Sequence, residues 1–296
     1  MNARRTLALC LALAAFTAAA DHEPWAARRY PQDENKWWWD ADWWARGTMP
    51  VPANHEVRAR PASFRNGAVE IPVEIYAPAP PGRHPVVVFL HGRRGIDELT
   101  SLVPLRIAAR GFTVVAPDLF SGRLIDKFPI RHDAELEDDA AASIDYALAL
   151  PEAAGQPKLC VISHTRGGYY ALKALVTKAR QAKTACYVSY YPHWQHPEAP
   201  EAMQVYQYAP EVDELRVPVM VFLGEHEQYQ RARPILAGID SLRKKDRDAR
   251  VIVYPGVGRG FDFRPPAVRT LADDLAAQDS LARAAAFMRQ HIGTLK

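Results

Sequence analysis

Short apolar runs, most of them rich in β-branched residues, recur along this 296-residue chain. Continuous β-branched runs are typical of strands that are buried on both faces of a parallel sheet. Stretches with a helical period lie between the runs, so strands and helices alternate along the chain. The runs predict strands over residues 85–90, 112–116, 158–162, 185–190, 217–223 and 250–254. The alternation predicts an α/β domain with a mostly parallel central sheet and helices on both faces.

One more strand is expected before these runs, because Val69, Ile71, Val73 and Ile75 alternate with other residues. The helical periods predict helices over residues 99–110, 134–150, 169–180, 231–244 and 271–291. Ligands of such sheets bind at the carboxyl ends of the strands. We therefore expect the functional residues directly after the strands.

The first twenty residues have the pattern of a secretory signal peptide. Arg4 and Arg5 begin it, an apolar stretch follows over residues 6–17, and Ala18–Ala20 supply the small residues of a cleavage site. The apolar stretch is too short for a membrane anchor, and no later run is long enough to span a bilayer. We expect residues 1–20 to be removed and the protein to be exported, to the periplasm or outside the cell.

Residues 21–66 differ from the rest because they hold six of the seven tryptophans. These are Trp25, Trp37, Trp38, Trp39, Trp43 and Trp44. We interpret this segment as an N-terminal arm that packs on the main domain or on another chain, because a large exposed aromatic area is a liability. The alternative is an aromatic platform for a sugar, a lipid surface or a partner. The main domain then covers residues 67–296.

The composition and the motifs exclude several classes of function. The chain has 37 basic and 34 acidic residues and no block of like charge, so no nucleic-acid partner is expected. It has no Gly-rich phosphate motif and no dinucleotide fingerprint, so no cofactor is expected. The stretches His193–His196 and Glu225–Glu227 resemble no established metal site, so no metal is expected.

Only Cys160 and Cys186 remain after removal of the leader. An oxidising compartment would allow them to form a disulfide. Their place in apolar, strand-like runs is equally typical of buried free thiols. Both interpretations stay open on the sequence alone.

Five strand-end motifs together resemble the dienelactone hydrolase family of α/β-hydrolases. They are PVVVFLHGRRG, AARGFTVVAPDLF, CVISHTRGGYYAL, VPVMVFLGEHE and VIVYPGVGRGF. Their order and spacing extend the resemblance over about residues 67–296. The resemblance implies an α/β-hydrolase fold and the hydrolysis of an ester or a lactone by a nucleophile, a histidine and an acid.

The resemblance assigns each catalytic role to one residue, and each of these residues departs from the family pattern. Thr165 lies at the nucleophile position of SHTRG, Glu227 at the acid position of GEHE, and Arg259 at the histidine position of YPGVGRGF. Threonine keeps a hydroxyl, but its β-branch crowds the approach of an acyl carbon. A guanidinium stays protonated and accepts no proton. Because general-base catalysis contributes roughly 10²–10⁴-fold, we expect weak or absent ester hydrolysis.

A histidine elsewhere at this edge is the one route by which a base could be restored. His193 follows the strand over residues 185–190 and is our preferred stand-in base for Thr165. The other polar residues of the strand ends are interpreted as packing or turn residues: His91, His164, His226 and Ser163.

Arginines accumulate at the same strand ends. Gly92 and Arg93 lie in the loop that normally helps form the oxyanion hole, and Arg166 follows Thr165. One hypothesis is a site that binds a carboxylate or another small anion without turning it over. The alternative is that Arg259 pairs with Glu227, because a buried arginine needs a partner. The expected ligand is a small-molecule ester or carboxylate.

Overall fold

The computed structural model describes residues 54–80 and 82–293. The expected signal peptide and the tryptophans of the arm lie outside these residues. The described chain forms an eight-stranded sheet with the strand order β1-β2-β4-β3-β5-β6-β7-β8. β2 is antiparallel to β1 and to β4, whereas all neighbours from β4 to β8 are parallel. The predicted α/β fold with a mostly parallel sheet is confirmed.

The strands are β1 (Val57–Asn66), β2 (Val69–Pro78), β3 (Val86–Leu90), β4 (Thr113–Pro117), β5 (Leu159–His164), β6 (Thr184–Tyr190), β7 (Val219–Gly224) and β8 (Ala249–Tyr254). The longer helices are α4 (Leu102–Ala109), α5 (Glu135–Ala149), α9 (Tyr229–Lys244) and α10 (Leu271–Ile292). The shorter helices are α6 (Gly167–Leu172), α7 (Glu201–Tyr206) and α8 (Glu211–Glu214). Each predicted strand and helix is present, with its ends shifted by a few residues, except that the helix predicted over residues 169–180 consists of α6 and a π-helical turn over Lys173–Thr177.

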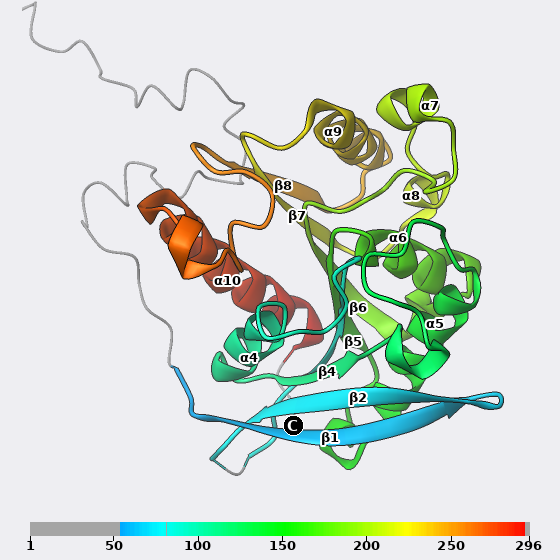
Figure 1. Cartoon of the computed structure of the whole chain (residues 1–296). Helices are drawn as coiled ribbons and strands as arrows, with labels where there is room; N and C mark the ends of the chain where they lie inside the picture. The colour runs from blue at the N-terminus through cyan, green and yellow to red at the C-terminus, as the bar shows by residue number, and fades with distance from the viewer. Residues whose placement is uncertain (1–53, 81, 294–296) are drawn as a thin grey trace, which may run out of the picture.

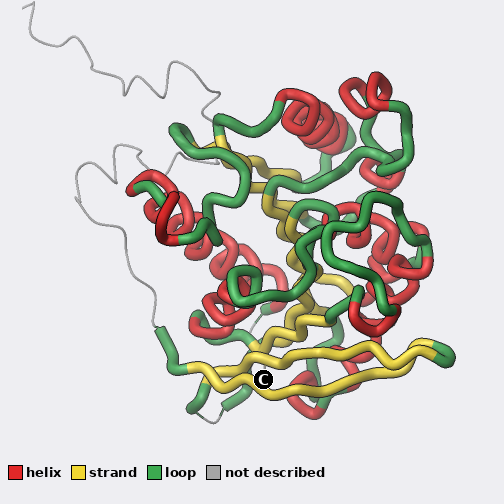
Figure 2. Tube along the Cα trace, in the orientation of Figure 1, coloured by secondary structure: helices red, strands yellow, loops and turns green. Residues whose placement is uncertain are grey.

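Helices cover the sheet on both faces, as the alternation predicted. α4 and α10 lie on one side of the sheet, and α5, α6 and α9 lie on the other (Figure 1). Figure 2 shows the same three layers, with the strands between the two groups of helices. Every residue of β3, β4, β5 and β7 is buried, which explains their unbroken apolar runs.

Within residues 54–80 and 82–293, no helix combines the length and the apolar character that a membrane span needs.

The first strand corrects the domain boundary that we placed at residue 67. β1 pairs with β2 along its whole length, from Val57 opposite Pro78 to Asn66 opposite Val69. Its ten residues therefore belong to the sheet and not to the arm. The sequence pattern hid this strand because it lies at the edge of the sheet, where only Phe64 is buried.

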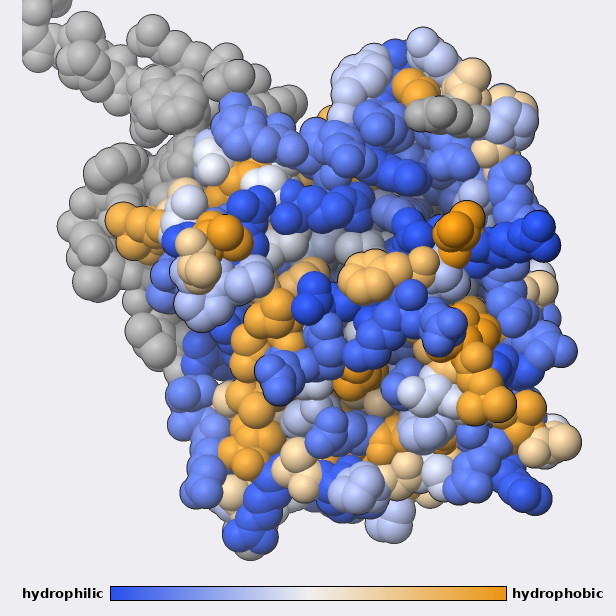
Figure 3. All heavy atoms as spheres, in the orientation of Figure 1, coloured by the Kyte–Doolittle hydropathy of each residue, from blue (hydrophilic) through white to orange (hydrophobic). Residues whose placement is uncertain are grey.

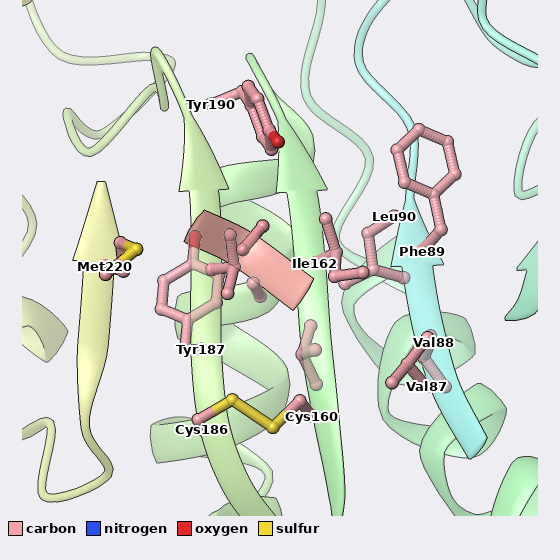
Figure 4. Packing of buried hydrophobic residues seen from close by; sticks show 14 of the residues in the cluster. Val87, Val88, Phe89, Leu90, Cys160, Ile162, Cys186, Tyr187, Tyr190 and Met220 are labelled. Carbon is pink, nitrogen blue, oxygen red and sulfur yellow. A yellow bond between two sulfur atoms is a disulfide. The ribbon is translucent and has the colours of Figure 1, made fainter. Parts of the chain in front are cut away.

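Cys160 and Cys186 form a disulfide between β5 and β6 (Figure 4). The two residues lie directly opposite each other in the strand register, and both are fully buried. The structure thus decides for the disulfide and against two free thiols. A covalent link between residues 26 positions apart restricts the unfolded chain and stabilises the centre of the sheet.

Candidate active site

Thr165 lies in the turn between β5 and α6, at the carboxyl edge of the sheet. Its φ of 47° is in the left-handed region, which is costly for a β-branched residue. Two backbone hydrogen bonds hold the turn: Thr165 N donates to Tyr190 O at 3.2 Å, and Thr165 O accepts from His193 N at 2.7 Å. The strained turn that exposes a nucleophile in this fold is therefore retained around a threonine.

The hydroxyl of Thr165 lies directly against the backbone of Gly92, which follows β3. A methyl group on Gly92 would lie 1.8 Å from Thr165 Oγ1 and 3.1 Å from Thr165 Cβ. A side chain at position 92 would therefore force Thr165 to move, which favours glycine there. No residue in the described part of the chain forms a hydrogen bond with the Thr165 hydroxyl.

Glu227 and Arg259 form an ion pair where the resemblance places the acid and the histidine. Arg259 Nε donates to Glu227 Oε1 at 3.0 Å, and the Glu227 side chain is only 1% exposed. The guanidinium also lies over the ring of Tyr191, 5.4 Å from its centre. The predicted pairing of these two residues is confirmed. Glu227 Oε2 and Arg259 Nη2 are buried and have no hydrogen-bond partner among the described residues.

His193 joins the site through its backbone, but its ring does not hydrogen-bond the Thr165 hydroxyl. Burial, followed by the charges of nearby arginines, holds the pKa of His193 well below its usual range. In decreasing order of effect, these are Arg259, Arg231, Arg166 and Arg93. The imidazole is therefore neutral at physiological pH. Neither of its ring nitrogens has a hydrogen-bond partner within residues 54–80 and 82–293.

The other histidines of this edge are either buried in packing roles or exposed. His91 is fully buried, with Nδ1 2.8 Å from Gly92 O and Nε2 accepting from Leu119 N at 3.1 Å. His164 is buried among aromatic rings, and its Nε2 lies 3.3 Å from Asp262 Oδ2. Burial lowers the pKa of both residues. His226 is exposed.

Ser163, the residue two positions before Thr165, lies beneath the turn and does not face the site. It is fully buried, and its Oγ is 2.8 Å from Tyr187 Oη and 2.7 Å from Ser189 Oγ. These contacts support its interpretation as the small residue of the turn.

The described residues contain no group of three His, Cys, Asp or Glu side chains that could hold a metal ion.

Arg93 and Arg166 lie side by side because they share one acceptor. Arg93 Nε donates to Pro129 O at 2.9 Å, and Arg166 Nη1 donates to the same oxygen at 3.1 Å. Further bonds to the carbonyls of Phe128 and Arg131 fix the two guanidiniums on this loop. The structure thus brings Arg93 and Arg166 together. Arg93 directly follows Gly92 in the chain, and Arg166 directly follows Thr165.

Arg231, in the first turn of α9, is a site residue that the sequence analysis missed. Its Nη1 lies 3.3 Å from Gln195 Oε1 and 3.3 Å from Gln204 Oε1. Burial, followed by the charge of Arg259 and then those of Arg166 and Arg93, lowers the pKa of Arg231, and the charge of Glu227 opposes this shift. No motif marked Arg231, because its position depends on how α9 packs against the loops that follow β6 and β8.

Two cavities flank this region. One of about 370 Å³ adjoins the ion pair and is lined by Glu227, Arg259 and the loops that carry them. The other, of about 450 Å³, lies between α4 and α10. Neither lining includes Thr165 or His193, and the smaller cavity is the one that contains the pair of Glu227 and Arg259.

The fold is that of the α/β-hydrolases. The structure is similar to the crystal structure of a protein from Klebsiella pneumoniae described as a dienelactone hydrolase, with a TM-score of 0.63 and 18% identity over 80% of this chain and 100% of that one. It is also similar to brefeldin A esterase, a bacterial homologue of human hormone sensitive lipase, with a TM-score of 0.63 and 17% identity over 83% and 80% of the two chains. At these identities the likeness establishes the fold alone.

A sequence profile of the dienelactone hydrolase family matches residues 71–292. The chain belongs to the dienelactone hydrolase family. Chlorophyllase-2 from Arabidopsis thaliana is 29% identical over 122 residues, which are 41% of this chain and 36% of the relative. The match thus spans about a third of that protein's length.

The contact between Gly92 and Thr165 predicts an energetic coupling between the two residues. Gly92→Ala is expected to destabilise the fold by about 1–3 kcal/mol, because the new methyl group overlaps the Thr165 hydroxyl. Thr165→Ala removes that oxygen, so Gly92→Ala should cost less in this background. Urea unfolding of the wild type, both single variants and the double variant measures the coupling. An equal cost in the two backgrounds would contradict the contact.

The buried histidines predict that stability falls as the pH drops below about 6.5. There the unfolded chain binds protons on His91, His164 and His193, whereas the folded chain does not, because its pKa values are lower. Each residue then lowers the free energy of unfolding by up to about 1.4 kcal/mol per pH unit.

His164→Phe keeps an aromatic ring in this packed position and removes one of the three titrations. Its unfolding free energy should therefore decrease less steeply with falling pH than that of the wild type. Urea unfolding of both proteins between about pH 5 and 7 measures the two slopes. A wild-type slope in His164→Phe would count against the prediction.

Proposed function

We propose that this protein is an exported member of the dienelactone hydrolase family that binds a small anionic ligand and hydrolyses esters weakly or not at all. The observation that carries the proposal is the ion pair between Arg259 and Glu227. In a nucleophile–histidine–acid site, the histidine takes the proton of the nucleophile and the acid orients the histidine. Arg259 has no acceptor lone pair, so the Thr165 hydroxyl has no base at this position.

The surroundings of Thr165 support the same conclusion. Its hydroxyl lies against Gly92, in the loop that supplies oxyanion donors in this fold. His193 is neutral and close along the backbone, but it forms no hydrogen bond with the hydroxyl among the described residues. Proton removal from Thr165 thus has no established route.

Anion binding is favoured by the partners of the arginines. Within the described ranges, Arg93, Arg166 and Arg231 donate to carbonyl and amide oxygens, and none of them pairs with a carboxylate. Neutral acceptors leave the positive charges uncompensated, and guanidiniums bind carboxylates and phosphates in bidentate geometry. In Figure 3, hydrophilic residues dominate the surface over α9 and the loops beside it.

The assay of ester hydrolysis tests the catalytic part of the proposal. The wild type is expected to hydrolyse p-nitrophenyl acetate slowly, at a rate that Thr165→Ala leaves unchanged. Thr165→Ser combined with Arg259→His restores a nucleophile and a base, so it should raise the rate by about 10²-fold or more. Thr165→Ser alone is the matched control, since it still lacks the base. Wild-type hydrolysis that is lost in Thr165→Ala, or an acyl adduct on Thr165, would refute the proposal.

Export is supported by the signal-peptide pattern and by the disulfide, which forms in oxidising compartments. We further propose that the tryptophan-rich arm packs on this domain or on another chain. Full-length protein expressed in a bacterial host and recovered from the periplasm should begin at Asp21, and its intact mass should lack the two hydrogens of Cys160 and Cys186. A retained leader, or alkylation of both cysteines without prior reduction, would contradict export with a formed disulfide.

A further inference from the structure

We propose that the four arginines around His193 form a binding site for a small dianion. The four are Arg93, Arg166, Arg231 and Arg259. This inference rests on the proposed anion binding and goes further, because it names the charge that the ligand carries. It follows from the number of guanidiniums, from the neutral groups that hold them and from buried donor atoms that remain unused.

Arg93 and Arg166 define one side of the site. Their shared contact with the Pro129 carbonyl holds two positive charges next to each other. Like charges repel, and a neutral carbonyl orients them without compensating their charge. Two adjacent guanidiniums held in this way are arranged to bind an anion from the same side.

Arg231 and Arg259 bring further charge from other elements. The two glutamines that contact Arg231 are neutral, whereas Arg259 pairs with Glu227. In the part of the chain that the structure describes, Glu227 is the one carboxylate that forms an ion pair with a member of this cluster. Four positive charges thus face one negative charge. A monoanion would leave two of them uncompensated, and a dianion leaves one.

Buried donors with no partner point to the place of the ligand. Arg259 Nη2 is buried and has no hydrogen-bond partner among the described residues. Arg166 Nε is also buried without a partner there, and the hydroxyl of Tyr170, which lacks a partner too, lies close enough to interact with this guanidinium. A buried donor without a partner is costly, and a charged one especially so. Anionic oxygens supplied by a ligand would satisfy these atoms.

His193 lies in the field of all four guanidiniums and adds no charge of its own. A neutral imidazole carries one N–H group. Its ring nitrogens have no partner within the described residues, so this N–H is available to an oxyanion. The residue that the sequence suggested as a base is thus better placed as a hydrogen-bond donor to the ligand.

Calorimetric titration of the purified protein with four salts tests the charge preference. The probes are sulfate, phosphate, succinate and acetate, at slightly alkaline pH and at constant ionic strength set with sodium chloride. The dianions should bind at least about tenfold more tightly than acetate, because they compensate one more charge. A preference for sulfate indicates a compact tetrahedral ligand, and a preference for succinate indicates a dicarboxylate; both support the dianion site.

Two variants locate the site. Arg231→Gln should weaken the binding of the preferred dianion by about tenfold, because a bound charge partner is lost. The matched control is Arg233→Gln on the same helix, whose exposed guanidinium stacks on Tyr206 and should not affect binding. Arg93→Gln gives a second test from a different element, and thermal unfolding shows that each variant is folded.

The outcomes separate this inference from the proposed function. Equal affinity for acetate and the dianions would overturn the proposed preference for a dianion, whereas the proposal that the protein binds a small anion would stand. No binding of any of the four salts would overturn both. Dianion binding that neither Arg231→Gln nor Arg93→Gln weakens would place the ion elsewhere and overturn the site. The ester assay reports on catalysis alone, and its result does not depend on these titrations.

Discussion

The carboxylate of Glu227 is buried, and a buried charge is tolerated only when another charge and hydrogen bonds compensate it. Arg259 provides that compensation and also stacks on Tyr191. A histidine can hold such a carboxylate and still exchange a proton, whereas an arginine can only hold it. The ion pair therefore keeps the contact between the loops that follow β7 and β8. Under the proposed function, proton transfer is lost at this position while the scaffold of the family is kept.

The turn at Thr165 is also part of this scaffold. Its left-handed backbone is held by hydrogen bonds with Tyr190, the last residue of β6, and with His193, which follows it, and these bonds do not involve the side chain. The hydrogen bonds that hold the turn therefore do not depend on the identity of the side chain. Gly92 remains glycine for a steric reason, since the Thr165 hydroxyl fills the space beside it. Packing and backbone geometry alone account for the turn and for this glycine.

The sequence predicted the buried strands well, because burial on both faces leaves an unbroken apolar run that polar positions do not interrupt. It missed β1 because only Phe64 of that edge strand is buried, so the apolar signal is nearly absent. The pairing of Cys160 with Cys186 depends on the register of β5 against β6, which no local pattern contains. Arg231 was missed for a similar reason: its role exists only where α9 meets the other strand ends.

A cluster of arginines without carboxylate partners destabilises a folded protein that has no anion bound. Arg93, Arg166 and Arg231 repel one another, and burial opposes the charge of Arg166 and Arg231. A purely structural cluster would gain stability from nearby carboxylates, as Arg259 does from Glu227. Ligand-binding sites often lower the stability of the free protein in this way. A bound anion supplies the missing negative charge and shifts the folding equilibrium toward the folded state. The proposed anion site thus accounts for a charge arrangement that folding alone does not favour.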